Sequence, residues 1–164
     1  MWVILRVAVN MVFFPLISVL LLKAIGFIDS IFLKTRKERI IPYIISNIFF
    51  FWMYLVFRNQ SEIPLILTAF VFAVFLASSI ALLANTYFKI SMHAIGVGGL
   101  IGILLVILGT NTSSPVTIPF AIAVLLAGIV CTSRMIASNH TQKEVYLGLL
   151  WGIICQIISA AIVL

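Results

Sequence analysis

The chain has 164 residues, of which 64% are hydrophobic and only 9% are Asp, Glu, Lys or Arg, and its formal net charge is +6. Soluble domains are about 45–50% apolar and about 25% charged, so a chain of this length cannot hide so much apolar surface from water. The composition excludes a soluble globular domain and predicts a protein whose solvent is lipid.

Six apolar stretches follow one another along the chain, each near the roughly 20 residues that a helix needs to cross the hydrocarbon core. Short polar segments separate them, and the alternating pattern of a membrane β-barrel is not visible. The sequence therefore predicts an all-α polytopic membrane bundle of about six transmembrane helices, forming one domain over residues 1–164. In chain order, the expected spans are Val3–Leu22, Ile40–Phe57, Ile63–Leu83, His93–Leu108, Pro115–Thr132 and Val145–Leu164.

Pairs of glycines four residues apart occur in two of these stretches. Gly98 and Gly102 lie in the fourth span, and Gly148 and Gly152 lie in the sixth. Small residues at this spacing let the backbones of two membrane helices approach closely. We expect tight helix contacts at both pairs.

Charged side chains are concentrated on one side of the predicted bundle. With six spans, the first, third and fifth connections share a membrane face, and in or beside them lie seven of the ten basic residues, both histidines and three of the four acids. The positive-inside rule is one explanation, and it would make this face cytoplasmic. The other is an anion site, because each of these connections leads into a helix N-terminus, where free N–H groups and the helix dipole attract anions.

The segment Ser133-Arg134-x5-His140-x3-Glu144 carries the sharpest chemical pattern. If the last helix begins near His140, then His140 and Glu144 share one helix face. A carboxylate bonded to one imidazole nitrogen fixes the tautomer and leaves the other nitrogen free to attack, while the planar fork of Arg134 suits phosphate oxygens. The alternative is an exposed histidine in a loop beside a solvated glutamate.

A second pattern, Ile90-Ser91-Met92-His93, lies at the expected start of the fourth span. His93 could donate a proton to a departing alkoxide, and Ser91 with the N–H groups that follow it could hold phosphate oxygens. The alternative is an interfacial histidine beside a helix cap.

These patterns resemble the type 2 phosphatidic acid phosphatase superfamily, which includes membrane lipid phosphatases, glucose-6-phosphatase and vanadium haloperoxidases. Its motifs are K-x6-R-P, P-S-G-H and S-R-x5-H-x3-D. The third motif matches from Ser133 to Glu144, with Glu in place of the final Asp. The second keeps Ser91 and His93 but has Met92 where the family has glycine.

The first motif of the family has its counterpart in the first connection. Arg39 and Pro42 follow a basic run that begins at Lys34, but Phe32 stands where the family has its lysine. Lys34 or one of its basic neighbours must therefore take the place of that lysine. All three motifs fall in or next to the connections that share one membrane face.

The resemblance implies hydrolysis of a membrane lipid phosphate, either a monoester or a diphosphate. His140 would be the nucleophile that forms a phosphohistidine, Glu144 would orient it, and His93 would be the general acid. The same resemblance assigns the binding of phosphoryl oxygens to four residues: Lys34, Arg39, Ser91 and Arg134. The alternative is a catalytically degenerate member that binds or transports lipid phosphate.

Neither a metal nor another cofactor is expected, because fixed cations and helix dipoles would stabilise the phosphoryl charge. Cys131 and Cys155 lie inside apolar stretches without metal-ligand spacing. The expected partners are a lipid phosphate substrate and membrane lipids, with no nucleic acid. The expected location is the membrane itself, most simply the inner (cell) membrane of a bacterium.

Overall fold

The computed structural model of the chain describes residues 2–28, 36–110, 115–137 and 141–164. In this part of the chain, six helical spans are long and apolar enough to cross a membrane. The predicted all-helical architecture with six spans is confirmed, and it is that of an integral membrane protein. The first span consists of α1 (Trp2–Ala8), a π-helical segment (Val9–Phe13) and α2 (Phe14–Ala24), and the others are α3 (Arg36–Arg58), α4 (Leu65–Tyr87), α5 (Met92–Gly109), α6 (Thr117–Ala137) and α7 (Gln142–Val163).

Large apolar side chains point outwards over the whole bundle. Trp2, Ile4, Leu125 and Ile162 are each at least 64% exposed. A water-soluble fold would bury such side chains, whereas hydrocarbon is a good solvent for them. The exposed surface therefore agrees with the composition in requiring lipid around the helices.

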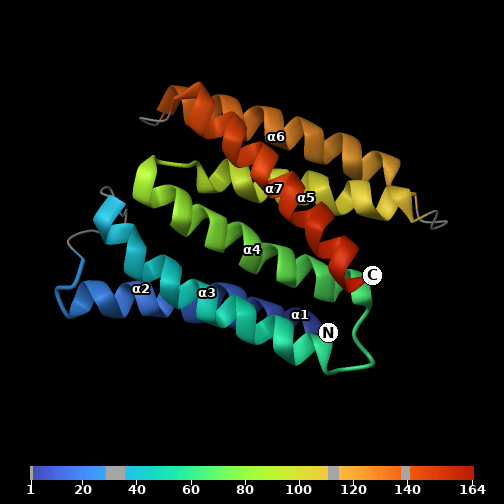
Figure 1. The fold of residues 1–164 in the computed structure, drawn as a ribbon, viewed down its shortest axis with the longest axis horizontal. Helices are drawn as coiled ribbons and strands as arrows, with labels where there is room; N and C mark the ends of the chain where they lie inside the picture. Colours follow the sequence, from blue (N-terminus) through green and yellow to red (C-terminus); the bar gives the residue numbers. More distant parts are fainter. Residues whose placement is uncertain (1, 29–35, 111–114, 138–140) are drawn as a thin grey trace.

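Helix α7 lies at the centre of the arrangement, packed against both α4 and α5 (Figure 1). Helix α3 packs against α4, α2 packs against α3, and α6 packs against α5. The helices α3, α5 and α7 begin at one end of the bundle, on the left in Figure 1, and α2, α4 and α6 finish there. We call this the site end, because it gathers the segments that the sequence marks as chemically equipped.

The contact between α5 and α7 depends on glycine, as the sequence predicts. A Cβ atom on Gly98 would collide with the carbonyl oxygen of Leu149, and one on Gly152 would collide with that of Ile95. A Cβ atom on Gly148 would lie only 2.8 Å from the carbonyl oxygen of Ser91. The two backbones are therefore close enough for α7 to hold the start of α5 in place.

Several helices extend further towards the site end than the apolar stretches predict, and α3 and α6 are two of them. Helix α3 begins at Arg36 instead of Ile40, and α6 continues past Thr132 to Ala137. The additional residues are mostly Arg, Lys, Glu, Met and Ala, which are good helix formers and prolong a helix beyond its apolar core. In consequence, Arg39 and Arg134 project from helical turns and not from loops.

Candidate functional site

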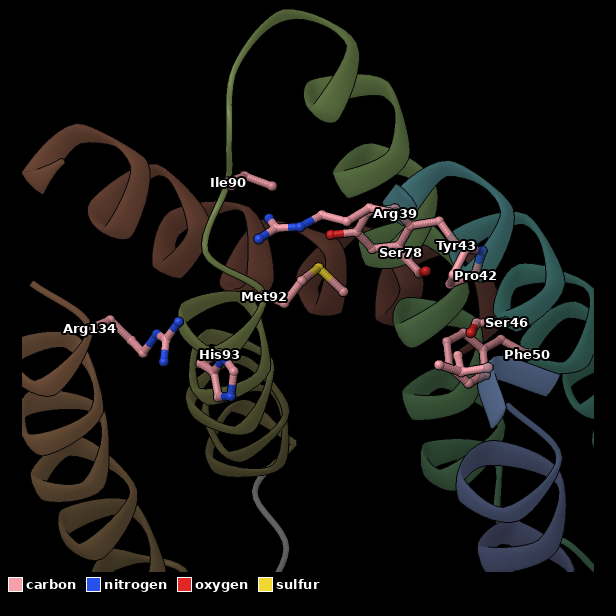
Figure 2. A pocket seen from close by; sticks show the side chains of 11 residues that line it. Arg39, Pro42, Tyr43, Ser46, Phe50, Ser78, Ile90, Met92, His93 and Arg134 are labelled. Carbon is pink, nitrogen blue, oxygen red and sulfur yellow. The ribbon is translucent and has the colours of Figure 1, made fainter. Parts of the chain in front are cut away.

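A cavity of about 360 Å³ opens at the site end of the bundle. Among the residues that the sequence singles out, Arg39 from α3, His93 from α5 and Arg134 from α6 line it (Figure 2). These three side chains come from parts of the chain more than forty residues apart, and the fold brings them to one space. The other lining residues are Val19, Pro42, Tyr43, Ser46, Phe50, Ser78, Ile90 and Met92.

One face of α3 supplies much of the polar lining. Arg39, Tyr43, Ser46 and Phe50 are spaced at i, i+4, i+7 and i+11, which places them in a single stripe along the helix. Tyr43 is buried, whereas Arg39 and Ser46 are half-buried. Sequence reasoning missed Tyr43 and Ser46, although their helical spacing from Arg39 is a signal that could have found them.

The start of α5 is tied to the start of α7 through Ser91. The hydroxyl oxygen of Ser91 accepts a hydrogen bond from the backbone N–H of Ala94 at 3.4 Å, and so caps α5. The backbone N–H of Ser91 donates to the carbonyl oxygen of Glu144 at 3.4 Å. Ser91 is fully buried and is not among the residues that line the cavity. Its role here is to fix the position of His93, and a contact with phosphate stays a prediction.

Met92 occupies the position at which the resembled family has glycine, and its side chain lines the cavity. In the view of Figure 2, its thioether lies between His93 on one side and Ser78 on the other. The flexible methionine side chain therefore takes up space beside the cationic groups that glycine would leave open.

Glu144 belongs to a capping box at the start of α7. Its Oε2 atom accepts a hydrogen bond from the backbone N–H of Thr141 at 2.9 Å, and the Thr141 hydroxyl accepts one from the backbone N–H of Glu144 at 3.3 Å. The helix thus begins at Gln142, two residues beyond the predicted nucleophile. His140 and Lys34 lie outside the described residues, so the orientation of His140 by Glu144 stays a prediction.

The two roles of Glu144, helix cap and partner of His140, can be separated by substitution. Replacing Thr141 by alanine removes the hydroxyl acceptor, and we expect it to lower the free energy of unfolding by about 1 kcal/mol. Replacing Glu144 by glutamine keeps an acceptor that suits a capping box and removes the charge, so we expect a smaller change in stability. Thermal unfolding of both purified variants in detergent measures these effects.

If the chain hydrolyses a lipid phosphate, as the resemblance implies, phosphate release by the same two variants tests the second role. If Glu144 also orients His140, Glu144→Gln lowers kcat more than Thr141→Ala does, despite its smaller effect on stability. If Glu144→Gln lowers kcat no more than Thr141→Ala does, Glu144 acts as a helix cap alone.

The electrostatic character of the cavity is cationic. Two guanidinium groups and an imidazole line it, and none of the described lining residues is acidic. The arginine fork matches a tetrahedral oxyanion, and partial enclosure by apolar side chains strengthens such an interaction relative to water. The cavity therefore has the chemistry of an anion site, and an arginine fork binds a carboxylate or a phosphate through two parallel hydrogen bonds.

Comparisons of the chain with protein-family models, with curated protein sequences and with solved structures gave no match. Fold and cavity together define the class: a six-span integral membrane protein with a cationic cavity at one end of its helices.

Proposed function

We propose that this protein hydrolyses the phosphate group of a membrane lipid, a monoester or a diphosphate, through a phosphohistidine intermediate. The observation that carries the proposal is the convergence of Arg39, His93 and Arg134 on one cavity. Each comes from a different one of the three sequence patterns that resemble the lipid phosphatase motifs. A chance match in one pattern would not by itself bring the other two to the same cavity.

The proposed reaction has two steps. In the first, an imidazole nitrogen of His140 attacks phosphorus and the bond from phosphorus to the leaving oxygen breaks. That oxygen belongs to the lipid alcohol in a monoester and to the lipid phosphate in a diphosphate, and His93 gives it a proton. In the second, water gives a proton to His93, attacks phosphorus and displaces the His140 nitrogen, which releases inorganic phosphate and restores His93 to its protonated form. Arg39 and Arg134 would stabilise the charge on the non-bridging oxygens in both steps.

A lipid is the favoured substrate because of where the cavity lies. Its lining residues come from five membrane-spanning segments, and their apolar members, such as Val19, Phe50 and Ile90, lie next to the cationic ones. A phosphorylated lipid matches this combination, with its phosphate at the bilayer surface and its chain in the hydrocarbon. Phosphatidic acid, phosphatidylglycerol phosphate, a polyprenyl diphosphate and a lipid A phosphate are the candidates.

Binding or transport of lipid phosphate without turnover is the second candidate. Met92 favours it, since its side chain occupies cavity space where the resembled enzymes have glycine. The engagement of Glu144 in a helix cap also favours it. This candidate predicts a stable complex with the same lipids and no release of phosphate.

Phosphate release from a panel of these lipids by the purified protein separates the two candidates. We expect turnover of at least one lipid by the wild type, and a fall in kcat/KM of about a hundredfold for Arg134→Gln, because a charged donor to the phosphoryl group is lost. Arg58→Gln is the matched control, since Arg58 is exposed at the last turn of α3, at the end of the bundle opposite the cavity.

The control defines what would contradict the proposal. An equal loss of activity in Arg58→Gln and Arg134→Gln would indicate a general effect of cationic charge and not a phosphate contact. Lipid binding without phosphate release from any member of the panel would support the non-catalytic candidate.

A further inference from the structure

A second cavity, of about 250 Å³, lies deeper between α3, α4, α5 and α7. It shares Phe50, Ser78 and Met92 with the cationic cavity, so the two spaces adjoin. Its remaining lining residues are almost all apolar or glycine: Phe70, Ala73, Val74, Ala77, Ile95, Gly96, Gly99, Gly152 and Gln156.

Ser78 is one of two polar side chains among the described residues that line this inner cavity. It is 4% exposed, and its hydroxyl oxygen has no hydrogen-bond partner among the described residues. The neighbouring Ser79 behaves as a serine in a membrane helix usually does, donating to the Phe75 carbonyl oxygen at 2.9 Å, one turn back. The Ser78 hydroxyl makes no such bond to a carbonyl oxygen of its own helix, although Ser78 is the residue next to Ser79.

Gln156 is the other polar side chain. It is 2% exposed on α7, and its Oε1 atom likewise has no partner in the described part of the chain. A buried amide without a partner is costly, and inside a membrane water is scarce. Two such groups on one cavity indicate that something else supplies their hydrogen bonds.

The position of the inner cavity fits the chain of a lipid whose phosphate lies in the cationic cavity. Ser78 lies nine residues before the end of α4 and Arg134 three before the end of α6, which at a rise of 1.5 Å per residue gives depths of about 14 Å and about 5 Å. Ser78 thus lies on the order of 10 Å deeper in the bundle than Arg134, the residue proposed to bind the phosphate. The volume is below the 300–1,000 Å³ or so of a pocket that encloses a drug-sized ligand, so it suits one chain segment.

We propose that the inner cavity binds one hydrocarbon chain of the phosphorylated lipid, and that Ser78 and Gln156 select a chain carrying a hydroxyl or amide group near its head-group end. The inference rests on the proposed function in so far as the phosphate occupies the cationic cavity. An ester carbonyl only accepts hydrogen bonds, whereas Oε1 of Gln156 requires a donor. A hydroxyl or an amide N–H supplies that donor, and a hydroxyl can also accept from Ser78.

The test compares two lipid phosphates that differ only in a hydroxyl on the third carbon of one acyl chain. Their non-hydrolysable phosphonate analogues are used for binding, so that the result does not depend on turnover. We expect the wild type to bind the hydroxylated analogue about tenfold more tightly, the effect of one or two net hydrogen bonds. A third analogue, with an amide in place of the ester, distinguishes an amide donor from a hydroxyl donor.

Substitutions locate the source of the preference. Ser78→Ala and Gln156→Leu should each bring the affinity ratio of the two analogues close to one. Ser79→Ala, which removes a hydroxyl already bonded to its own helix, should leave the ratio unchanged. Ser78→Ala removes a single oxygen and preserves helix propensity, so it remains a valid test should Gln156→Leu fail to fold.

Three results overturn the inference: equal wild-type affinity for the ester, hydroxylated and amide analogues, a preference that survives both substitutions, and no binding of any analogue. The first is the result expected if water alone satisfies Ser78 and Gln156. Failure of the proposed function gives a different result, in which the hydroxylated analogue is preferred but its hydrolysable counterpart releases no phosphate. Turnover without any chain preference would leave the phosphatase proposal standing and remove this one.

Discussion

Replacing His140 by alanine is expected to reduce phosphate release from lipid by at least about a thousandfold. If His140 is the nucleophile, as proposed, its removal eliminates the covalent route, and loss of such a residue in other enzymes lowers kcat by several orders of magnitude. Initial rates of phosphate release by wild-type and variant protein, at equal amounts in detergent micelles containing the substrate lipid, measure the effect.

The intermediate provides an independent measurement. Quenching the wild type in alkali during turnover of lipid with a radiolabelled phosphate should leave label on the protein, because a phosphoramidate bond to histidine forms before water attacks. His140→Ala should carry none. His93→Ala should still acquire label from a lipid analogue with an acidic leaving group, since such a group departs without a proton from a general acid.

Normal turnover by His140→Ala would refute the phosphohistidine mechanism. Label on the protein in that variant would place the nucleophile elsewhere. The variant should also unfold at the wild-type temperature, which excludes misfolding as the reason for lost activity.

The number and order of the helices followed from the sequence because a membrane imposes few alternatives. Each backbone polar group must find a partner within its own helix, so apolar runs of sufficient length determine the spans. The glycine pairs predicted tight helix contacts, and the structure has them between α5 and α7, where Gly98 and Gly152 lie against the backbone of the other helix. Which helix each pair would meet did not follow from the sequence. Placement of Arg39, His93 and Arg134 at one end of the bundle followed from the count of spans.

Which residues line the cavity was harder to predict from the sequence, because this depends on the rotation of each helix about its own axis. Ser78 lies in a long apolar stretch, and nothing in its sequence neighbourhood distinguishes it from Ser79. Only the packing of α4 places Ser78 among the residues that line the two cavities, whereas the Ser79 hydroxyl donates to its own helix.

Prediction from the sequence was incomplete at Thr141 and Glu144 for a different reason, because one sequence pattern is compatible with two structural roles. A threonine three residues before a glutamate at the start of an apolar run is the pattern of a capping box, and the structure has that box. From the sequence, the same glutamate is predicted either to orient His140 or to be solvated, and neither prediction includes the cap. A carboxylate has two oxygens and several acceptor positions, so the cap does not exclude the second role.

Gly152→Ala is expected to lower the free energy of unfolding by about 3 kcal/mol or more. The added Cβ atom would meet the carbonyl oxygen of Ile95 and lie 2.7 Å from the backbone nitrogen of Gly99. Backbone atoms of a packed helix cannot move aside as a flexible side chain can, so α5 and α7 must separate. Thermal or denaturant unfolding in detergent measures the loss.

Gly128→Ala is the matched control, because a Cβ atom at Gly128 on α6 would have no neighbour within 4 Å. That change should be neutral or stabilise the protein by up to about 1 kcal/mol, since alanine is a better helix former than glycine. Equal stability of the two variants would contradict the close approach of α5 and α7. If the approach is as close as the structure has it, Gly152→Ala should also impair phosphate release under conditions in which the protein stays folded, because separating the helices moves His93 relative to Arg39 and Arg134.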